Sequence, residues 1–208
     1  MLDKEIQIAL DSCIELYSLG DNLDIFHTAK KEYTALTGAF NEEDEDFEHR
    51  VNSFHDWFLF HYELPQIKRR PIIEFLLRSN FNMDLEKTIL NTNFSLFEFI
   101  KEEKGVSLFK NLLTAEEFNV MPEQSKGTFI SGDVFISHVM LAESLHFFSR
   151  GVCLIPSELK KSILTEIKKN NLGNEHSSKN KFLLNLQRLK TKSKNYSHLP
   201  AEKVFVFN

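Results

Sequence analysis

One stretch of the sequence decides the fold: SFHDWFLFHYELP, residues Ser53–Pro65. It holds the only tryptophan of the chain and its densest run of aromatic residues. Apolar residues follow a helical spacing along one face, and further ones cover the other sides: Phe47, Val51, Phe54, Phe58 and Tyr62, with Trp57, Leu59, Phe60 and Leu64. A helix that is apolar nearly all round is typically central and buried. Pro65 ends it, because a proline disfavours helical backbone in the residue before it.

Further helices are predicted on both sides of this stretch. Apolar residues recur at steps of three and four in four segments bounded by glycine, proline or capping residues: 2–17, 23–36, 71–78 and 83–90. Asn41 is expected to cap the central helix and to place acidic residues 42–44 in its first turn, where the helix dipole favours negative charge. Residues 1–92 are therefore interpreted as a helical domain.

The period of the pattern changes after this region. From Phe94 to Pro156, short apolar runs alternate with glycine-containing turns at a spacing of roughly ten residues, which indicates a small antiparallel β barrel or curled sheet. The last run is expected to break at Gly151. Residues 94–113 remain open to a helical interpretation, because such short runs do not fix the period. A β module over 93–156 after a helical domain makes the fold class α+β.

Residues 157–208 form the third predicted region. A basic helix is expected from Pro156 to about Lys169, a polar loop from 170 to 180, and an amphipathic helix around Phe182 and Leu189. The apolar run Val204–Phe207 is typical of a strand. This region carries eleven Lys/Arg and four Asp/Glu, a net charge of +7, whereas residues 1–156 carry −12. Such asymmetry predicts either docking of the basic region on the acidic body or an anionic partner.

Composition excludes several classes of protein. The chain has 208 residues, 42% hydrophobic and 26% charged, and its 20 phenylalanines argue for a folded core. Two distant cysteines, Cys13 and Cys153, are no disulfide framework, and no zinc-ligand spacing is present. The N-terminus lacks the features of a signal peptide, and no apolar run has the roughly 20 residues needed to span a membrane. A cytoplasmic location without a membrane partner is expected.

Three stretches carry a family resemblance: FHDWFLFHY (Phe54–Tyr62), PIIEFL (Pro71–Leu76) and GDVFIS (Gly132–Ser137). Together they resemble a pattern in uncharacterised bacterial proteins, some of which end in a SEC-C type zinc motif. The resemblance covers about residues 50 to 156 and implies a helical region joined to a β module. It implies no activity and no zinc site, because the cysteine-rich motif is absent. His61 and His138 stand where an aspartate and an arginine are expected.

Histidines offer two hypotheses of chemistry. Asp24-x-x-His27 and Asp46-x-x-His49 each place a carboxylate and an imidazole on one helical face, so a metal-dependent enzyme is one alternative. Within the central stretch, His55, Asp56 and His61 form a possible acid–base set. His55 and Asp56 point about 100° apart on a helix, and no partner that would orient a base is evident. No GxSxG, P-loop or GxGxxG motif is present.

The basic C-terminal region offers the other alternative, nucleic-acid binding beside a small barrel. Its candidate contacts are Lys160, Lys161, Lys168, Lys169, Lys181, Arg188, Lys190 and Lys192. A solvated face, or docking on the chain's own acidic helices, explains the same residues. Because no convergent set of catalytic or ligand residues is evident, the favoured function is a non-catalytic interaction or adaptor module. It is expected to bind a protein partner or itself, and no catalytic residue, metal ligand or cofactor is assigned.

Overall fold

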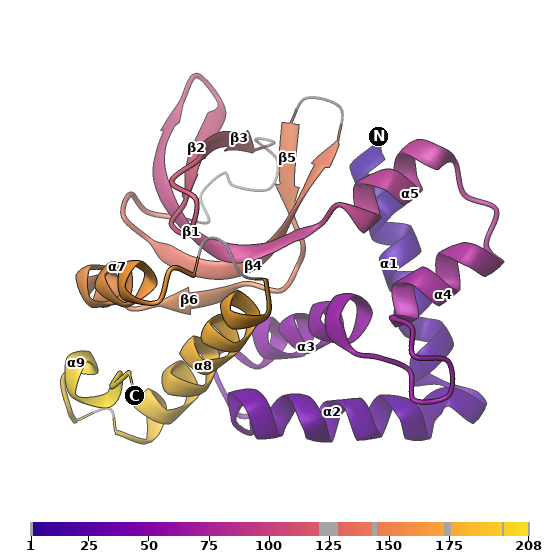
Figure 1. The fold of residues 1–208 in the computed structure, drawn as a ribbon, viewed down its shortest axis with the longest axis horizontal. Helices are drawn as coiled ribbons and strands as arrows, with labels where there is room; N and C mark the ends of the chain where they lie inside the picture. Colours follow the sequence, from indigo (N-terminus) through magenta and orange to yellow (C-terminus); the bar gives the residue numbers. More distant parts are fainter. Residues whose placement is uncertain (1, 121–128, 143–144, 173–175, 197, 208) are drawn as a thin grey trace.

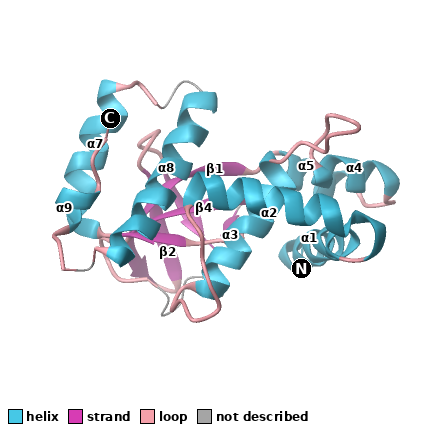
Figure 2. Cartoon of the chain, turned by 90° about the horizontal axis from the view of Figure 1, so that it is seen from below, coloured by secondary structure: helices cyan, strands magenta, loops and turns pink. Residues whose placement is uncertain are grey.

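A computed structural model describes all residues except 1, 121–128, 143–144, 173–175, 197 and 208 (Figure 1). The N-terminal helices are α1 (Leu2–Ser18), α2 (Leu23–Thr37), α3 (Phe47–His61), α4 (Pro71–Arg78) and α5 (Met83–Leu90), with a 3₁₀ turn at Gly20–Asn22. Seen from below, α2 and α3 lie under the sheet, whereas α1, α4 and α5 extend to one side of it (Figure 2). The predicted α+β fold is confirmed.

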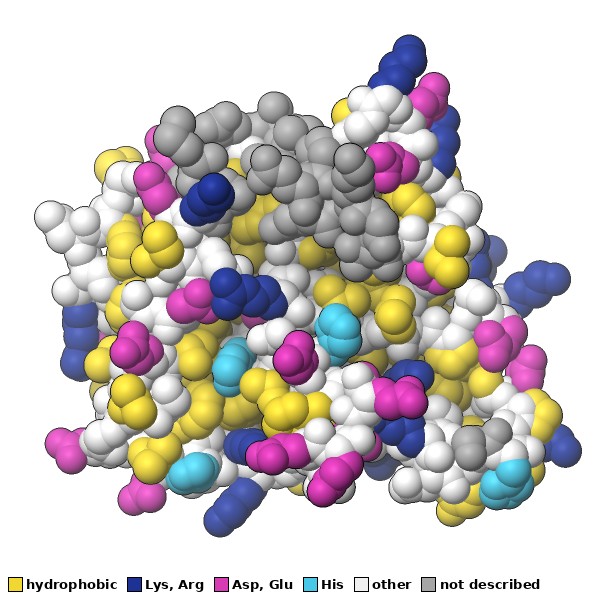
Figure 3. Space-filling view, turned by 180° about the vertical axis from the view of Figure 1, so that it is seen from behind, with side chains coloured by type: hydrophobic (Ala, Val, Ile, Leu, Met, Phe, Trp, Pro, Cys, Tyr) yellow, Lys and Arg dark blue, Asp and Glu magenta, His cyan; other side chains and the backbone are white. Residues whose placement is uncertain are grey.

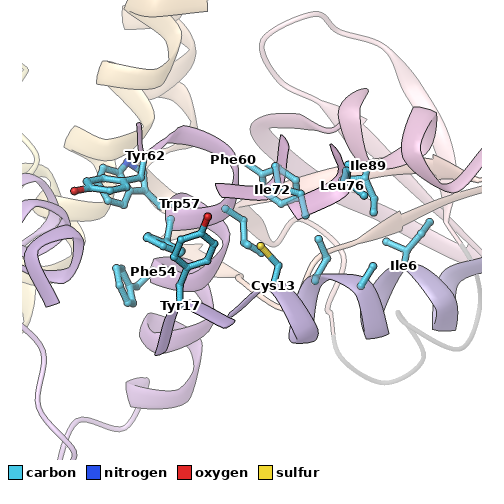
Figure 4. Packing of buried hydrophobic residues seen from close by; sticks show 14 of the residues in the cluster. Ile6, Cys13, Tyr17, Phe54, Trp57, Phe60, Tyr62, Ile72, Leu76 and Ile89 are labelled. Carbon is cyan, nitrogen blue, oxygen red and sulfur yellow. The ribbon is translucent and has the colours of Figure 1, made fainter. Parts of the chain in front are cut away.

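Helix α3 is central, as its composition predicts. Phe54, Phe58, Leu59 and Phe60 are each no more than 2% exposed, and Trp57 is 7% exposed. Helix α1 supplies Ile6, Cys13 and Tyr17 to the same core (Figure 4). Aromatic edge contacts join the helices, since the Tyr17 and Phe58 ring centroids lie 5.4 Å apart. Such offset and edge-on pairs are the favoured geometry for aromatic rings.

The start of α3 differs from the prediction. The helix begins at Phe47 with Asp46 as its N-cap, so residues 42–44 are not its first turn. Instead, the Asn41 amide donates to Asp44 Oδ2 (2.8 Å), which holds a turn ahead of the helix. Asp44 and Asp46 both form ion pairs with Lys194. Of the acidic residues 42–44, Asp44 therefore contacts the C-terminal region and does not lie in the first turn of α3.

Six strands form the sheet: β1 (Asn93–Glu103), β2 (Val106–Asn111), β3 (Glu117–Val120), β4 (Val134–Ala142), β5 (Leu145–Phe148) and β6 (Cys153–Ile155). The order is β1-β2-β3-β5-β4, and β4 also pairs with β1, which closes a small barrel. The pairing is antiparallel except for one parallel bridge, Val120 with His146. Residues 94–113 are therefore strands, and no helix occurs there. Phenylalanines dominate one barrel cluster: Phe97, Phe99, Phe109, Phe118, Phe135 and Phe148, with Val120 and Val139.

One edge of β4 carries two strands in succession. Its residues 139–142 pair with β5, and residues 134–136 pair with β6. The connection at residues 149–152 interrupts the ladder, which confirms the predicted break at Gly151. Helix α3 packs against this interruption, because Ser53 and Asp56 approach Gly151 closely.

The C-terminal region is helical: a 3₁₀ turn at Ser157–Leu159, then α7 (Lys160–Lys169), α8 (His176–Asn195) and α9 (Ala201–Val204). The strand predicted for Val204–Phe207 is wrong. Val204 ends α9, and Val204 and Phe205 are buried in a cluster formed by α7, α8 and the outer face of the sheet. Val204 and Phe205 bury their side chains without a strand partner, whereas Val206 is exposed.

Two core clusters extend across the boundaries at 92 and 156. The helical core includes Met140, Ala142 and Phe147 of the barrel. A second cluster joins strands β1, β4 and β6 to α7, α8 and α9. Among the described residues, no helix is both long and apolar enough to cross a membrane.

Candidate functional site

Two regions compete as the functional site: the buried contact between α3 and the β5–β6 connection, called the joint, and an open groove beside it. The joint requires a glycine at position 151. A Cβ there would lie 2.8 Å from Ser53 Cα and would collide with the Asp56 carboxylate. The backbone of α3 therefore approaches the barrel more closely than any side chain at residue 151 allows.

Asp56 is the centre of the joint and is only 5% exposed. Its Oδ2 accepts hydrogen bonds from Ser149 Oγ (2.6 Å) and the Gly151 amide (3.0 Å). His138 Nδ1 on β4 lies 3.8 Å from the same oxygen. Ser137 Oγ donates to Gly151 O (2.8 Å), which completes the interrupted ladder by a side chain. Buried polar groups are normally satisfied in this way.

A chain of rings and amides extends from Asp56 to α8. His138 Nε2 and His61 Nε2 lie 2.8 Å apart, so one ring donates to the other. His61 Nδ1 in turn lies 3.4 Å from Asn180 Nδ2. Phe94 stacks on the His138 ring at 4.5 Å between centroids. The joint thus connects α3, β4 and α8 through polar contacts inside an aromatic environment.

Burial shifts the pKa values of two titratable members of the joint, Asp56 and His138. It raises the pKa of Asp56 to about 7, although hydrogen bonds from Ser149 and Gly151 and the charge of Arg150 oppose the shift. Burial also lowers the pKa of His138 well below its usual value, and the nearby His61 and Lys179 act in the same direction. His138 is therefore neutral at physiological pH, and the joint avoids an isolated buried cation.

The joint is closed to substrates. The cavity beside Asp56 and His138 has a volume of about 10 Å³, which is close to the space for a single water molecule. Tyr33 and Gln187 line it as well, and Tyr33 Oη donates to Gln187 Oε1 (2.9 Å). Perturbed pKa values often mark active sites, but a catalytic group also needs access to the reacting atoms. The joint is an internal polar network with no room for a reaction.

The predicted acid–base set is divided by the structure. Asp56 and His61 belong to one network, but only through His138. His55 points elsewhere, with its ring centroid 5.9 Å from that of Phe26, and burial lowers its pKa to about 4. Sequence reasoning missed His138 and Ser149. One signal was available, because Ser137 and His138 are polar residues inside an otherwise apolar strand.

The proposed metal pairs do not converge among the described residues, which contain no group of three or more His, Cys, Asp or Glu suited to a metal. Asp46 forms an ion pair with Lys194, and His49 lines the open groove. Both cysteines are buried and free. Burial raises the pKa of Cys153 to about 11 and raises that of Cys13 further, so neither thiol is activated as a nucleophile.

An open groove of about 490 Å³ lies next to the joint, between α1, α3 and β5. We call it the barrel groove. Its apolar lining comes from Phe129, Phe147, Phe148 and Val152, and its polar lining comes from Lys4, Gln7, Glu48, His49, Asn52, Ser149 and Arg150. This volume falls within the usual range of ligand pockets. Exposed hydrophobic side chains lie among charged ones on the face opposite that of Figure 1 (Figure 3).

The eight basic candidates are divided in the structure. Lys160 pairs with Glu98 of β1 (2.5 Å), so part of the basic region contacts a carboxylate of the β module. Lys169 pairs with Glu166 within α7 itself (3.6 Å). Lys161 and Lys168 are exposed on α7, and Lys190 is half-buried on α8. Three exposed residues share one face of α8 because they follow steps of seven and four: Lys181, Arg188 and Lys192.

Comparisons with known proteins give no relative. No protein-family model matches the chain, and no curated protein or solved structure is significantly similar to it.

Proposed function

We propose that this protein is a non-catalytic interaction module that binds a segment of a partner protein in the barrel groove. The proposal rests on one observation: the titratable network lies inside the joint, whereas the open surface lies in the barrel groove. Asp56 and His138 are buried in the joint, with the half-buried His61 beside them. The barrel groove is open, and the hydroxyl of Ser149 in its lining donates inward to Asp56. A surface that combines an apolar floor with polar groups at its edge is suited to recognition.

The lining of the groove indicates the chemistry of the partner segment. Phe129, Phe147 and Phe148 offer an apolar floor for one aromatic or aliphatic side chain. Gln7 and Asn52 offer amides for the backbone of an extended peptide. Two cations, Lys4 and Arg150, line the groove against one carboxylate, Glu48. Arg150 also pairs with Asp11 (2.9 Å), an exposed ion pair that a carboxylate of the partner can replace at little cost. An extended segment with an apolar anchor next to an acidic residue fits this arrangement best.

Location is part of the same proposal. Cys13 and Cys153 are free thiols in the structure, and both are buried. Reduced cysteines are usual in the cytoplasm, where disulfides are rare. A cytoplasmic partner protein is therefore the expected ligand.

A displayed library of short random peptides, panned on the full chain, tests the proposal. Enriched peptides are expected to share an apolar residue next to Asp or Glu. Gln7→Trp, which fills the groove from α1, is expected to lower their affinity at least about tenfold. Lys31→Trp on the exposed side of α2 is the matched control and should leave affinity unchanged.

Two outcomes would reject the groove as the binding site. One is enrichment of peptides that bind Gln7→Trp as well as they bind the unmodified protein. The other is a dimer in sedimentation velocity that Gln7→Trp disrupts, since a second copy of the chain would then occupy the groove. Failure to enrich any peptide would count against a linear segment as the ligand.

A further inference from the structure

A second groove, distinct from the barrel groove, lies between the loop after α2, the C-terminal half of α8 and the segment after α9. We call it the α8 groove, and its volume is about 610 Å³. Its lining combines polar and apolar residues: Gly38, Ala39, Asn41, Asp44, Arg188, Leu189, Thr191, Lys192, Lys194, Asn195, Val204 and Val206. Three of these residues are cationic and one is acidic.

The charges of the α8 groove do not cancel. Lys194 is held between Asp44 (3.5 Å) and Asp46, so this cation is balanced. Neither Arg188 nor Lys192 forms an ion pair with a carboxylate in the described part of the chain. Arg188 donates to the Asn185 side chain (3.0 Å), and the Lys192 ammonium lies 5.9 Å from the centre of the Tyr196 ring. Both cations are exposed and remain available to an anion.

A buried arginine adds positive charge behind the wall of the groove. Arg50 is 3% exposed and makes no ion pair with a described carboxylate. It donates instead to the Gly38 carbonyl (2.8 Å) and to Thr191 Oγ1, and both of these residues line the groove. Its Nε has no hydrogen-bond partner among the described residues. A cation at the C-terminal carbonyls of α2 is favoured by the helix dipole, and these carbonyls and the Phe40 ring, rather than a paired carboxylate among the described residues, are its direct partners.

The wall between Arg50 and the groove is thin because Gly38 and Thr191 meet closely. Gly38 has φ +89°, which other residues rarely adopt, and a Cβ there would lie 2.7 Å from Thr191 Cγ2. The field of Arg50 therefore reaches the groove through backbone and one threonine. Charges act more strongly across such low-dielectric material than across water. Cations outnumber carboxylates among the residues that line the groove, although the chain as a whole has a net charge of −5.

We propose that the α8 groove binds a small phosphorylated ligand, with Arg188 and Lys192 as the phosphate contacts. Arginine matches the geometry of phosphate oxygens, and lysine adds a mobile point charge. Leu189, Val204 and Val206 form an apolar side for the organic part of the ligand. The volume suits a ligand of nucleotide size. A nucleic-acid strand fits less well, because Lys181 continues the cationic face of α8 but does not line the groove.

Isothermal titration calorimetry on the full chain at low ionic strength tests this proposal, with adenosine monophosphate and inorganic pyrophosphate as probes. At least one probe is expected to bind with a dissociation constant below about 1 mM. The double variant Arg188→Gln/Lys192→Gln should weaken that binding at least about tenfold, because both phosphate contacts are lost. Lys161→Gln/Lys168→Gln removes the same charge from α7 and should leave it unchanged.

All four side chains are exposed, so both double variants should keep the stability of the unmodified protein. Thermal melting verifies that they are folded. Three results would overturn the proposal. The first is that neither probe binds at about 1 mM. The second is an equal loss in both double variants, which would reflect net charge alone. The third is tighter binding of a single-stranded oligonucleotide that Lys181→Gln weakens, because a strand along α8 would then be the ligand.

Discussion

The joint and the barrel groove share a wall but have opposite properties. Ser149 belongs to both: its hydroxyl donates to Asp56 inside, and the residue lines the groove outside. Within the joint, the two imidazoles lie 2.8 Å apart and the Asp56 carboxylate lies 3.8 Å from His138, with space for about one water molecule. The groove has roughly 490 Å³ but offers a mixture of separate polar groups. The difference shows that the buried titratable residues connect elements of the fold, whereas the space large enough for a ligand lies at the open surface.

The two faces of α3 show the same division on one helix. One face packs into the aromatic core of the helical region through Phe54 and Phe58. The other presents Ser53 and Asp56 to the barrel, where polar groups fix the position of the contact. Apolar packing provides most of the stability of a core, and satisfied buried polar groups define one geometry for it.

The largest expected effect comes from the apolar face. Trp57→Ala should lower the free energy of unfolding by about 3–5 kcal/mol, because it leaves a cavity beside Tyr33 and Tyr62. Tyr196→Ala, at an aromatic residue that is 42% exposed, serves as the control and should cost about 0.5 kcal/mol or less. Chemical denaturation measures both. If Trp57→Ala kept its stability but lost peptide binding, α3 would be an exposed docking surface and not part of the core.

Close approach at the joint gives the next largest effect. Gly151→Ala should destabilise the protein by about 1–3 kcal/mol, because the new methyl group forces α3 away from the barrel. Gly105→Ala is the matched control: it has φ +76° but no atom within 4 Å of its Cβ, so only backbone strain opposes it. Each variant is measured by the same denaturation experiment. A smaller cost at Gly151 than at Gly105 would show that the joint is loosely packed.

The protonation of Asp56 gives a pH-dependent effect of defined sign. Its folded pKa of about 7 lies above the ordinary 3.8, so the folded state binds the proton more tightly than the unfolded state does. The contribution of Asp56 to stability is then complete below about pH 4 and is lost as the pH rises toward 7. Asp56→Asn has no proton to lose. Its stability relative to the unmodified protein should therefore improve with pH, by at most about 1.4 kcal/mol per pH unit in this window.

Taking the difference between the two proteins removes other titrations. His138 acts with the opposite sign, because its folded pKa is lowered and its neutral form costs stability as the pH falls below the ordinary 6.5. That contribution is common to both proteins. If the unfolding free energies of the two proteins ran parallel from pH 4 to 7, Asp56 would be ionised over that range. Its hydrogen bonds would then outweigh the effect of burial on its pKa.

The smallest effect on stability is expected at the edge of the groove. Arg150→Glu breaks an exposed ion pair with Asp11 (2.9 Å), which should change the unfolding free energy by less than about 1 kcal/mol. The same substitution reverses the charge of a residue that lines the barrel groove, so it should weaken the binding of acidic peptides. Lys31→Glu makes an identical charge change on α2. Equal weakening by both variants would assign the effect to overall charge, which salt screens.

Local pattern predicted the architecture well. The apolar surround of Trp57 identified the central helix, and Gly151 located the break between β5 and β6. Local pattern failed to predict where α3 begins, because residues far away in the sequence contact that region. Asp44 and Asp46 form ion pairs with Lys194 of α8, 148 residues away from Asp46, and the helix begins at Phe47 and not after an Asn41 cap.

The contacts of the joint could not be predicted from the sequence, because they also join residues that are far apart in the chain. Asp56 lies 93 residues from Ser149 and 95 from Gly151, and His61 lies 77 from His138. Helical and strand periods describe neighbours within a single element, and these contacts join different elements. The grooves are also products of several elements, since the barrel groove takes residues from α1, α3 and β5.

The most direct test of the central claim compares one joint variant with one groove variant. The affinity of a selected peptide is measured by calorimetry for the unmodified protein, Asp56→Asn and Gln7→Trp, each verified as folded. We expect unchanged affinity for Asp56→Asn and at least about a tenfold loss for Gln7→Trp. Loss of binding in Asp56→Asn with full binding in Gln7→Trp would contradict it, because the buried network would then be the functional site.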